Sequence, residues 1–102
     1  MIVEYIRYKI ESSRQESFIE AYQNASEFLR ESEFCMGYEL TQCEEVKENF
    51  ILRIDWTSTQ DHLNGFRKSP EFGQFLNLIR PYFNDIQEMN HYEPTKVVNR
   101  KV

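Results

Sequence analysis

The sequence predicts one domain of the α+β class, in which helices cover one face of an antiparallel sheet. Stretches with the two-residue periodicity of strands and stretches with helical periodicity follow one another in the order βαββααβ. The chain has 102 residues, which is close to the usual size of one domain. Its eight Phe and six Tyr residues supply large apolar side chains for a single core.

Residues 2–10 are expected to form the first strand, because apolar side chains recur on one side of it. Glu4 interrupts that apolar side. Ser13 stands three residues before Glu16, which is the pattern of a capping box at a helix start. Apolar residues at helical spacing then predict an amphipathic helix to about Glu31.

Residues 35–46 and 49–57 are expected to form a hairpin around a turn at residues 47–49. In the second of these strands, one side is apolar throughout and consists of Phe50, Leu52, Ile54 and Trp56. Helices are expected to pack on that side. Cys35 and Cys43 would lie about 26 Å apart in one extended strand, so no disulfide between them is expected.

Two short helices and a last strand are predicted in the C-terminal half. Ser58 and Asp61 repeat the capping-box pattern and open a helix through residue 68, and residues 69–71 start the next helix. Pro81 is expected to end or bend that helix. Residues 84–92 return as a strand, which completes a ferredoxin-like arrangement. We expect a single domain over residues 1–94 and a polar tail over residues 95–102.

The uncovered face of the predicted sheet carries several large side chains. Tyr5, Ile51 and either Tyr38 or Met36 would face water there, among charged residues. Because large apolar side chains seldom gather on a free surface, we expect a second copy of the chain to cover this face. The predicted assembly is a symmetric homodimer packed face to face.

Composition excludes several classes of function. The net charge of −5 argues against a nucleic-acid binder or a protein of anionic membrane surfaces, since both use clustered Lys and Arg. No segment approaches the roughly 18 apolar residues of a membrane span, so a soluble, cytoplasmic protein is expected. The cysteines have no His or Cys at ligand spacing, and three glycines do not make a phosphate loop. We expect no metal and no cofactor.

Residues 51–83, ILRIDWTSTQDHLNGFRKSPEFGQFLNLIRPYF, contain a strand ending in Trp, a short helix, a Ser-Pro break and an aromatic residue. This segment resembles the antibiotic biosynthesis monooxygenase family of small dimeric α+β barrel proteins. The resemblance implies a pocket between sheet and helices that is sized for a flat aromatic substrate. It also implies oxidation of phenol, quinol or anthrone substrates by oxygen without metal or flavin, because an electron-rich phenolate can itself give an electron to oxygen.

The chain departs from the family pattern in this segment. The family often has His-x-x-Ser/Thr-Pro-His-Phe, whereas this chain has Phe66 and Glu71 at the two histidine positions. The haem-degrading branch has a Trp at the position of Phe66, a His at that of Leu76 and an Asn in the first strand, and this chain lacks all three. His62 lies four residues before Phe66, on the same face of the predicted helix, and could reach the same pocket.

His62 is the candidate catalytic base, because imidazole titrates near neutral pH. The competing interpretation is an exposed helix residue bonded to solvent. Trp56, Phe66 and Phe72 are candidate substrate contacts, although each is also suited to the core. Tyr82 and Tyr22 are candidate hydrogen-bond donors to a quinone oxygen.

Further polar residues have two interpretations each. Arg7 and Arg53 should face away from the helices, where they either pair with acidic residues or stabilise an oxyanion. Tyr38 is a further candidate donor, and the side of the sheet that His91 faces is undetermined. The bend around Pro81 is either structural or part of a site.

The sequence leaves three functions open. The first is a cofactor-independent monooxygenase-like enzyme that acts on a small aromatic substrate, with His62 as the base. The second is a non-catalytic small-molecule-binding or accessory dimer of the same fold, which the two missing histidines favour. The third, by resemblance, is an isomerase or stress-related activity on a reactive carbonyl compound.

Overall fold

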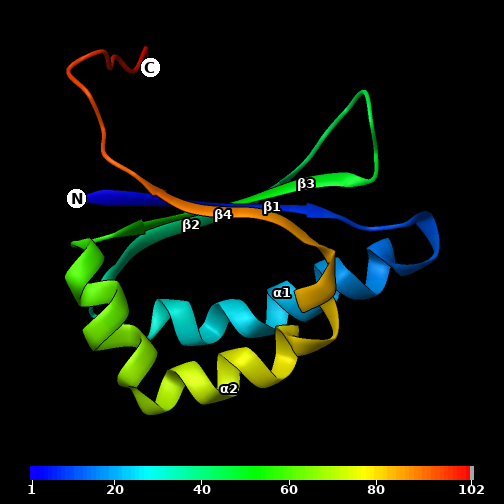
Figure 1. Cartoon of the computed structure of the whole chain (residues 1–102), viewed down its shortest axis with the longest axis horizontal. Coiled ribbons are helices and arrows are strands. Elements are labelled where there is room, and N and C mark those ends of the chain that lie inside the picture. The colour runs from blue at the N-terminus through cyan, green and yellow to red at the C-terminus, as the bar shows by residue number, and fades with distance from the viewer. Residues whose placement is uncertain (102) are drawn as a thin grey trace.

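The computed structural model describes residues 1–101 and contains one four-stranded antiparallel sheet in the order β2-β3-β1-β4. The strands are β1 (Ile2–Lys9), β2 (Cys35–Gln42), β3 (Asn49–Trp56) and β4 (Ile86–Tyr92). Figure 1 shows α1 and α2 together on one side of this sheet. The predicted α+β fold and its ferredoxin-like element order are therefore confirmed.

The two longer helices are α1 (Gln15–Arg30) and α2 (Pro70–Ile79). The capping box predicted at the start of α1 is wrong: Ser13 lies in a 3-10 turn, Ser12–Arg14, and Arg14 is the N-cap without a side-chain hydrogen bond. Pro70 occupies the first turn of α2, where its missing N–H needs no partner. The chain passes from α2 into the 3-10 segment Arg80–Asp85, so Pro81 follows the end of the α-helix as predicted.

The helix predicted between Ser58 and residue 68 is irregular. Ser58 does cap it, since its Oγ accepts the Asp61 N–H at 2.9 Å. The segment then forms a π-helix turn, Asp61–Gly65 (η2), and a 3-10 turn, Phe66–Lys68 (η3). Gly65 is required here because a Cβ atom would meet the ring of Phe34 at 2.6 Å. The wide turn brings two aromatic residues, His62 and Phe66, inward.

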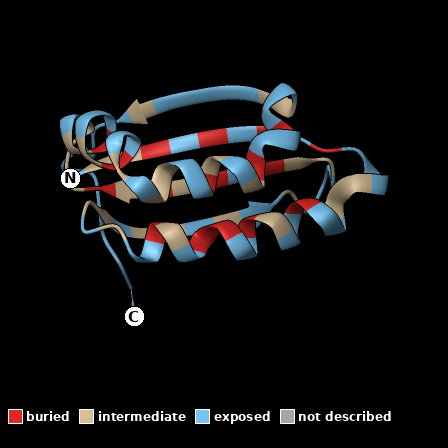
Figure 2. Cartoon of the chain, turned by 90° about the horizontal axis from the view of Figure 1, so that it is seen from below, coloured by how far each residue is buried: buried red, intermediate tan, exposed pale blue. Residues whose placement is uncertain are grey.

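The core lies between the sheet and the helices. The alternation predicted for β3 is confirmed, because Phe50, Leu52, Ile54 and Trp56 are all buried. Figure 2 shows buried positions recurring along both helices. Phe18 of α1 forms edge-to-face contacts with Tyr8 and Phe50 at centroid distances of 4.8 and 5.0 Å. Such pairs add to the burial of apolar area, so this aromatic cluster anchors α1 on the sheet.

The opposite face of the sheet is uncovered in one chain. Tyr5 and Ile51 are exposed on it, as predicted. Of the two alternatives for β2, Met36 is exposed, whereas the hydroxyl of Tyr38 lies near α1 and accepts a hydrogen bond from Arg30 at 2.9 Å. Residues 93–101 form no helix or strand and extend from the end of β4 (Figure 1). Val102, the last residue of the predicted tail, lies outside the described residues.

None of the helices in residues 1–101 has the length and apolar character that crossing a membrane requires.

Candidate functional site

A cavity of about 510 Å³ lies between the helix-covered face of the sheet and the segment from η2 to α2. Most of its wall is apolar, and the lining residues include Tyr8, Ile54, Trp56, Phe66, Phe72 and Phe75. Glu4, His62 and Arg67 supply polar groups. The volume and the aromatic wall are suited to a small flat molecule.

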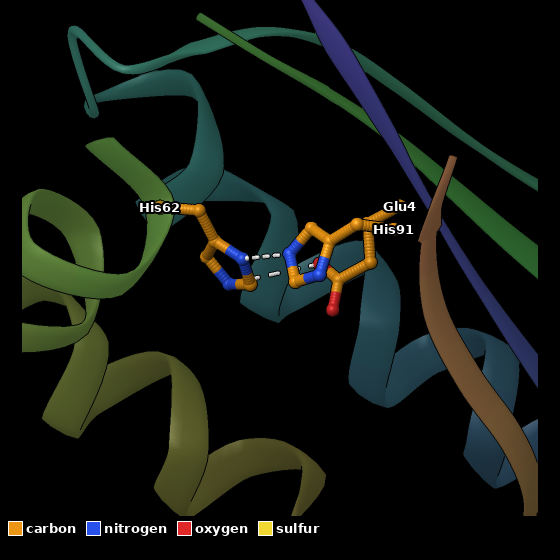
Figure 3. Close-up of side chains that lie close together, drawn as sticks. All are labelled: Glu4, His62 and His91. Carbon is orange, nitrogen blue, oxygen red and sulfur yellow. Dashed lines mark hydrogen bonds and ion pairs between the residues drawn. The ribbon is translucent and has the colours of Figure 1, made fainter. Parts of the chain in front are cut away.

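Glu4, His62 and His91 form a polar cluster at this cavity (Figure 3). His62 Nδ1 and His91 Nε2 are hydrogen-bonded at 2.8 Å. His62 Nε2 lies 3.7 Å from Glu4 Oε1. Glu4 and His62 are buried and His91 is half-buried, so His91 is the member of the cluster most accessible to solvent.

Strand register brings two members of the cluster together. Glu4 on β1 is paired directly with His91 on β4, so both side chains lie on the helix-covered face. His62 enters from η2, and its ring stacks on Trp56 with centroids 4.3 Å apart and planes 10° from parallel. Trp56 in turn donates its indole N–H to Glu4 Oε1 at 3.0 Å. The single Trp of the chain thus holds both buried members in place.

Burial controls the charges of the cluster. Desolvation raises the pKa of Glu4 above its usual value, although the Trp56 hydrogen bond and the nearby His91 and Arg67 oppose this shift. Desolvation lowers the pKa of His62 to about 3, with Arg67 and His91 acting in the same direction. At neutral pH the His62 ring is therefore uncharged, and one of its nitrogens carries a free lone pair.

Four of the predicted site residues lie at this cavity: His62, Trp56, Phe66 and Phe72. The alternative that His62 is an exposed helix residue is wrong, because only 3% of its surface is exposed. Its burial follows from the π-helix turn and from stacking on Trp56, neither of which helical periodicity indicates.

The two candidate tyrosines lie elsewhere. The Tyr82 hydroxyl donates to Ser17 Oγ at 2.9 Å, and the Arg14 guanidinium lies 5.0 Å from the centroid of its ring, so Tyr82 holds the Pro81 bend against the start of α1. Tyr22 hydrogen-bonds Tyr8 and lines a second cavity, of about 520 Å³, between α1 and the β2–β3 hairpin. The third candidate donor, Tyr38, also lines that second cavity.

The candidate arginines face away from the first cavity. Arg7 lies 3.9 Å from Glu88, and Arg53 lies 3.5 Å from Asp55 and 4.0 Å from Glu39. These contacts confirm ion pairing on the uncovered face. In the single chain the Arg7–Glu88 pair is half-exposed.

The sequence did not place Glu4 at the site and left the side of the sheet that His91 faces open. The available signal for Glu4 was a carboxylate on the apolar side of a strand, since such a group is buried only with polar partners. The signal for His91 was weaker, because its side of the sheet depends on the pairing of β1 with β4. A bulge between Arg7 and Tyr8 shifts that pairing.

Comparisons with known proteins agree with this fold. The uncharacterized protein YczJ of Bacillus subtilis (strain 168) is 22% identical over 93 residues, which are 91% of this chain and 98% of that protein. A Bordetella bronchiseptica protein, named as a candidate antibiotic biosynthesis monooxygenase, has a TM-score of 0.80 at 21% identity, covering 92% of this chain and 96% of that one. A conserved protein of Methanosarcina mazei Go1 has a TM-score of 0.76 at 18% identity, covering 92% of each chain.

These structural likenesses, at such low identity, establish the fold. The sequence model of one family, antibiotic biosynthesis monooxygenase, matches residues 1–78. The match includes β1, β3 and η2, and therefore Glu4, Trp56 and His62. Because it spans most of the chain, the chain belongs to the antibiotic biosynthesis monooxygenase family.

Proposed function

We propose that the chain is a monooxygenase-like enzyme that binds a small phenol, quinol or anthrone in the first cavity and removes its proton. The observation that carries this proposal is a hydrogen-bonded pair of histidines, His62 and His91, of which His62 lines a largely apolar cavity. An aromatic wall favours a flat apolar substrate, and an imidazole pair accepts a proton from its hydroxyl.

Proton removal requires both histidines. With a pKa of about 3, His62 alone is a weak base. In the tautomer with the proton on Nδ1, His62 gives that proton to His91 Nε2 while its own Nε2 takes the substrate proton. The positive charge then resides on the half-buried His91, where water can stabilise it. The proposed base is the pair.

The remaining tasks of the protein are positioning and exclusion of water. Phe66 packs on Trp56 with centroids 5.0 Å apart, and Phe72 packs edge-to-face on Phe66 at 5.6 Å. These rings would hold a flat substrate against the sheet. Once it is deprotonated, an electron-rich phenolate reacts with oxygen directly, so the proposed activity uses no flavin or metal.

A non-catalytic small-molecule-binding protein is the second candidate. It is favoured by Phe66 and Glu71 at the family's usual histidine positions and by the low basicity of His62. In this case the cavity would bind the same class of aromatic molecule without oxidising it.

Oxygen uptake by metal-stripped protein, measured with a panel of hydroquinones, anthrones and catechols, separates the two candidates. We expect uptake that falls at least about a hundredfold in His62→Gln and in His91→Gln, which is the low end of general-base contributions. Tyr38→Phe, which changes a residue of the second cavity that does not line the first, is the matched control and should retain the rate. Saturable binding without uptake would support the second candidate and contradict the first.

We also propose that a second copy covers the uncovered face of the sheet. Tyr5 and Tyr92 form an edge-to-face pair there at 5.3 Å, and Ile51 is 41% exposed beside them. Arg53 Nε is buried without a hydrogen-bond partner among the described residues. Ile51→Asp should convert the dimer to monomers and lower the melting temperature, as sedimentation and thermal unfolding would show. A monomeric Ile51→Asp with unchanged melting temperature would contradict this interface.

A further inference from the structure

We propose that Glu4, His62 and His91 form a binding site for one divalent first-row transition-metal ion. Each residue offers one ligand atom, and these atoms all lie within 4.8 Å of one another. The three side chains come from β1, η2 and β4, so the fold converges on this point from distant parts of the chain (Figure 3). This inference goes beyond the proposed oxygenation: a bound ion would replace the proton shared by His62 and His91, so the metal-bound form is a different state from the metal-free base.

The spacing of the donors is close to that around a metal. Ligands about 2.1 Å from an ion and adjacent to one another are separated by roughly 3.0–3.4 Å. His62 Nδ1 and His91 Nε2 are 2.8 Å apart, and one ligand atom from each of the three residues lies within 4.8 Å of the other two. Small rotations of the Glu4 side chain and of the half-buried His91 ring are enough to close the site.

The side chain of Glu4 is held in a fixed orientation, as a metal ligand usually is. Trp56 donates to Glu4 Oε1, which fixes the group as outer hydrogen bonds commonly fix metal ligands. Among the described residues Oε2 receives no hydrogen bond, and Figure 3 shows it turned away from His62. Because Glu4 lines the first cavity, this second oxygen is available to bind a cation.

The donor set indicates the class of metal. Two imidazoles and one carboxylate suit Fe(II), Zn(II) and Co(II), and they do not suit Mg(II), which prefers oxygen ligands. Three protein ligands leave coordination positions open, and both Glu4 and His62 line the first cavity. A small molecule in the cavity could therefore reach the ion.

Arg67 is the feature that opposes a cation here. It lines the same cavity, and its positive charge lowers the pKa of both Glu4 and His62. Removing that charge should strengthen metal binding. Arg67→Gln therefore offers a gain of affinity, which damage to the fold would not produce.

The test is a titration of untagged, metal-stripped protein with Co²⁺, followed by visible absorption and calorimetry. We expect one Co²⁺ per chain and shifts of the ring nitrogen resonances of both histidines, the only two in the chain, when Zn²⁺ replaces it. Glu4→Gln and His91→Ala should weaken Co²⁺ binding at least about a hundredfold, and Arg67→Gln should tighten it severalfold. Mg²⁺ should not compete.

Glu88→Gln is the matched control, because Glu88 is an acidic residue of β4 that pairs with Arg7 on the other face. Its Co²⁺ affinity should equal that of the unmodified chain. His91 is half-buried on an edge strand, so His91→Ala decides the question if Glu4→Gln fails to fold. Absence of Co²⁺ binding by folded protein, or equal affinity in folded His91→Ala, would overturn the site. Neither result depends on oxygen uptake.

Discussion

The helix-covered face of the sheet holds two cavities of nearly equal size that differ in chemistry. The first, of about 510 Å³, has Glu4 and His62 in an aromatic wall. The second, of about 520 Å³, has two tyrosine hydroxyls that already have hydrogen-bond partners in the protein. Tyr22 is hydrogen-bonded to Tyr8, and Tyr38 accepts a hydrogen bond from Arg30. Volume therefore does not distinguish a site from a packing gap. A binding site is distinguished from a packing gap by polar groups that can still form hydrogen bonds to a ligand.

Filling one cavity at a time should give the largest difference between the two cavities, which we expect in the affinity for a small quinol. Leu76→Phe enlarges a side chain that lines the first cavity, and Leu40→Phe does the same in the second. We expect Leu76→Phe to weaken binding of a small quinol at least about tenfold, because the added ring occupies the space of the substrate. Leu40→Phe should leave the affinity unchanged. Equal losses in the two variants, measured by calorimetry, would erase the distinction between the cavities.

The Glu4–His62–His91 cluster and the hydrogen-bonded pair of Tyr8 and Tyr22 should also affect stability with opposite signs. Glu4→Gln removes a buried carboxyl but keeps an acceptor for Trp56, so we expect the free energy of unfolding to rise by about 1 kcal/mol. Tyr22→Phe leaves the buried Tyr8 hydroxyl without its partner and should cost about 1–3 kcal/mol. Denaturant unfolding of metal-free protein measures both changes. A loss of stability in Glu4→Gln would show that the carboxyl is part of the structural framework.

The effect confined to the narrowest range of conditions is at alkaline pH and belongs to the tyrosine pair. Burial raises the pKa of Tyr8 to about 12, whereas an unfolded tyrosine ionises near pH 10. Between these values the folded state keeps a proton that the unfolded state has lost. The free energy of unfolding should therefore fall as the pH rises from 10 to 12, by at most about 1.4 kcal/mol per pH unit for this group. Tyr8→Phe should make that decline shallower, and an unchanged slope would contradict this cause.

The fold could be predicted from the sequence because it depends on repeated local signals. The apolar alternation through Phe50 and Trp56, and the helical spacing from Phe18 to Leu29, each repeat over several residues. The start of α1 was predicted incorrectly because a capping box is a single short pattern. In the structure a 3-10 turn takes its place.

The site was predictable only in part. Trp56 and Phe66 lie at the cavity because they continue regular apolar patterns. Glu4 and His91 are brought together by strand pairing between residues far apart in the chain, and single-sequence patterns carry no information on that pairing. The burial of His62 depends on an irregular turn, which helical periodicity does not describe.

The central claim is that the first cavity binds a small aromatic molecule beside Trp56. Trp56 is the only tryptophan in the chain and lines that cavity, so its fluorescence reports directly on occupancy. Titration with a hydroquinone should quench this fluorescence saturably, with one site per chain, and Leu76→Phe should weaken the effect while Leu40→Phe does not. Quenching that rises linearly without saturation, and equally in all three proteins, would contradict the account.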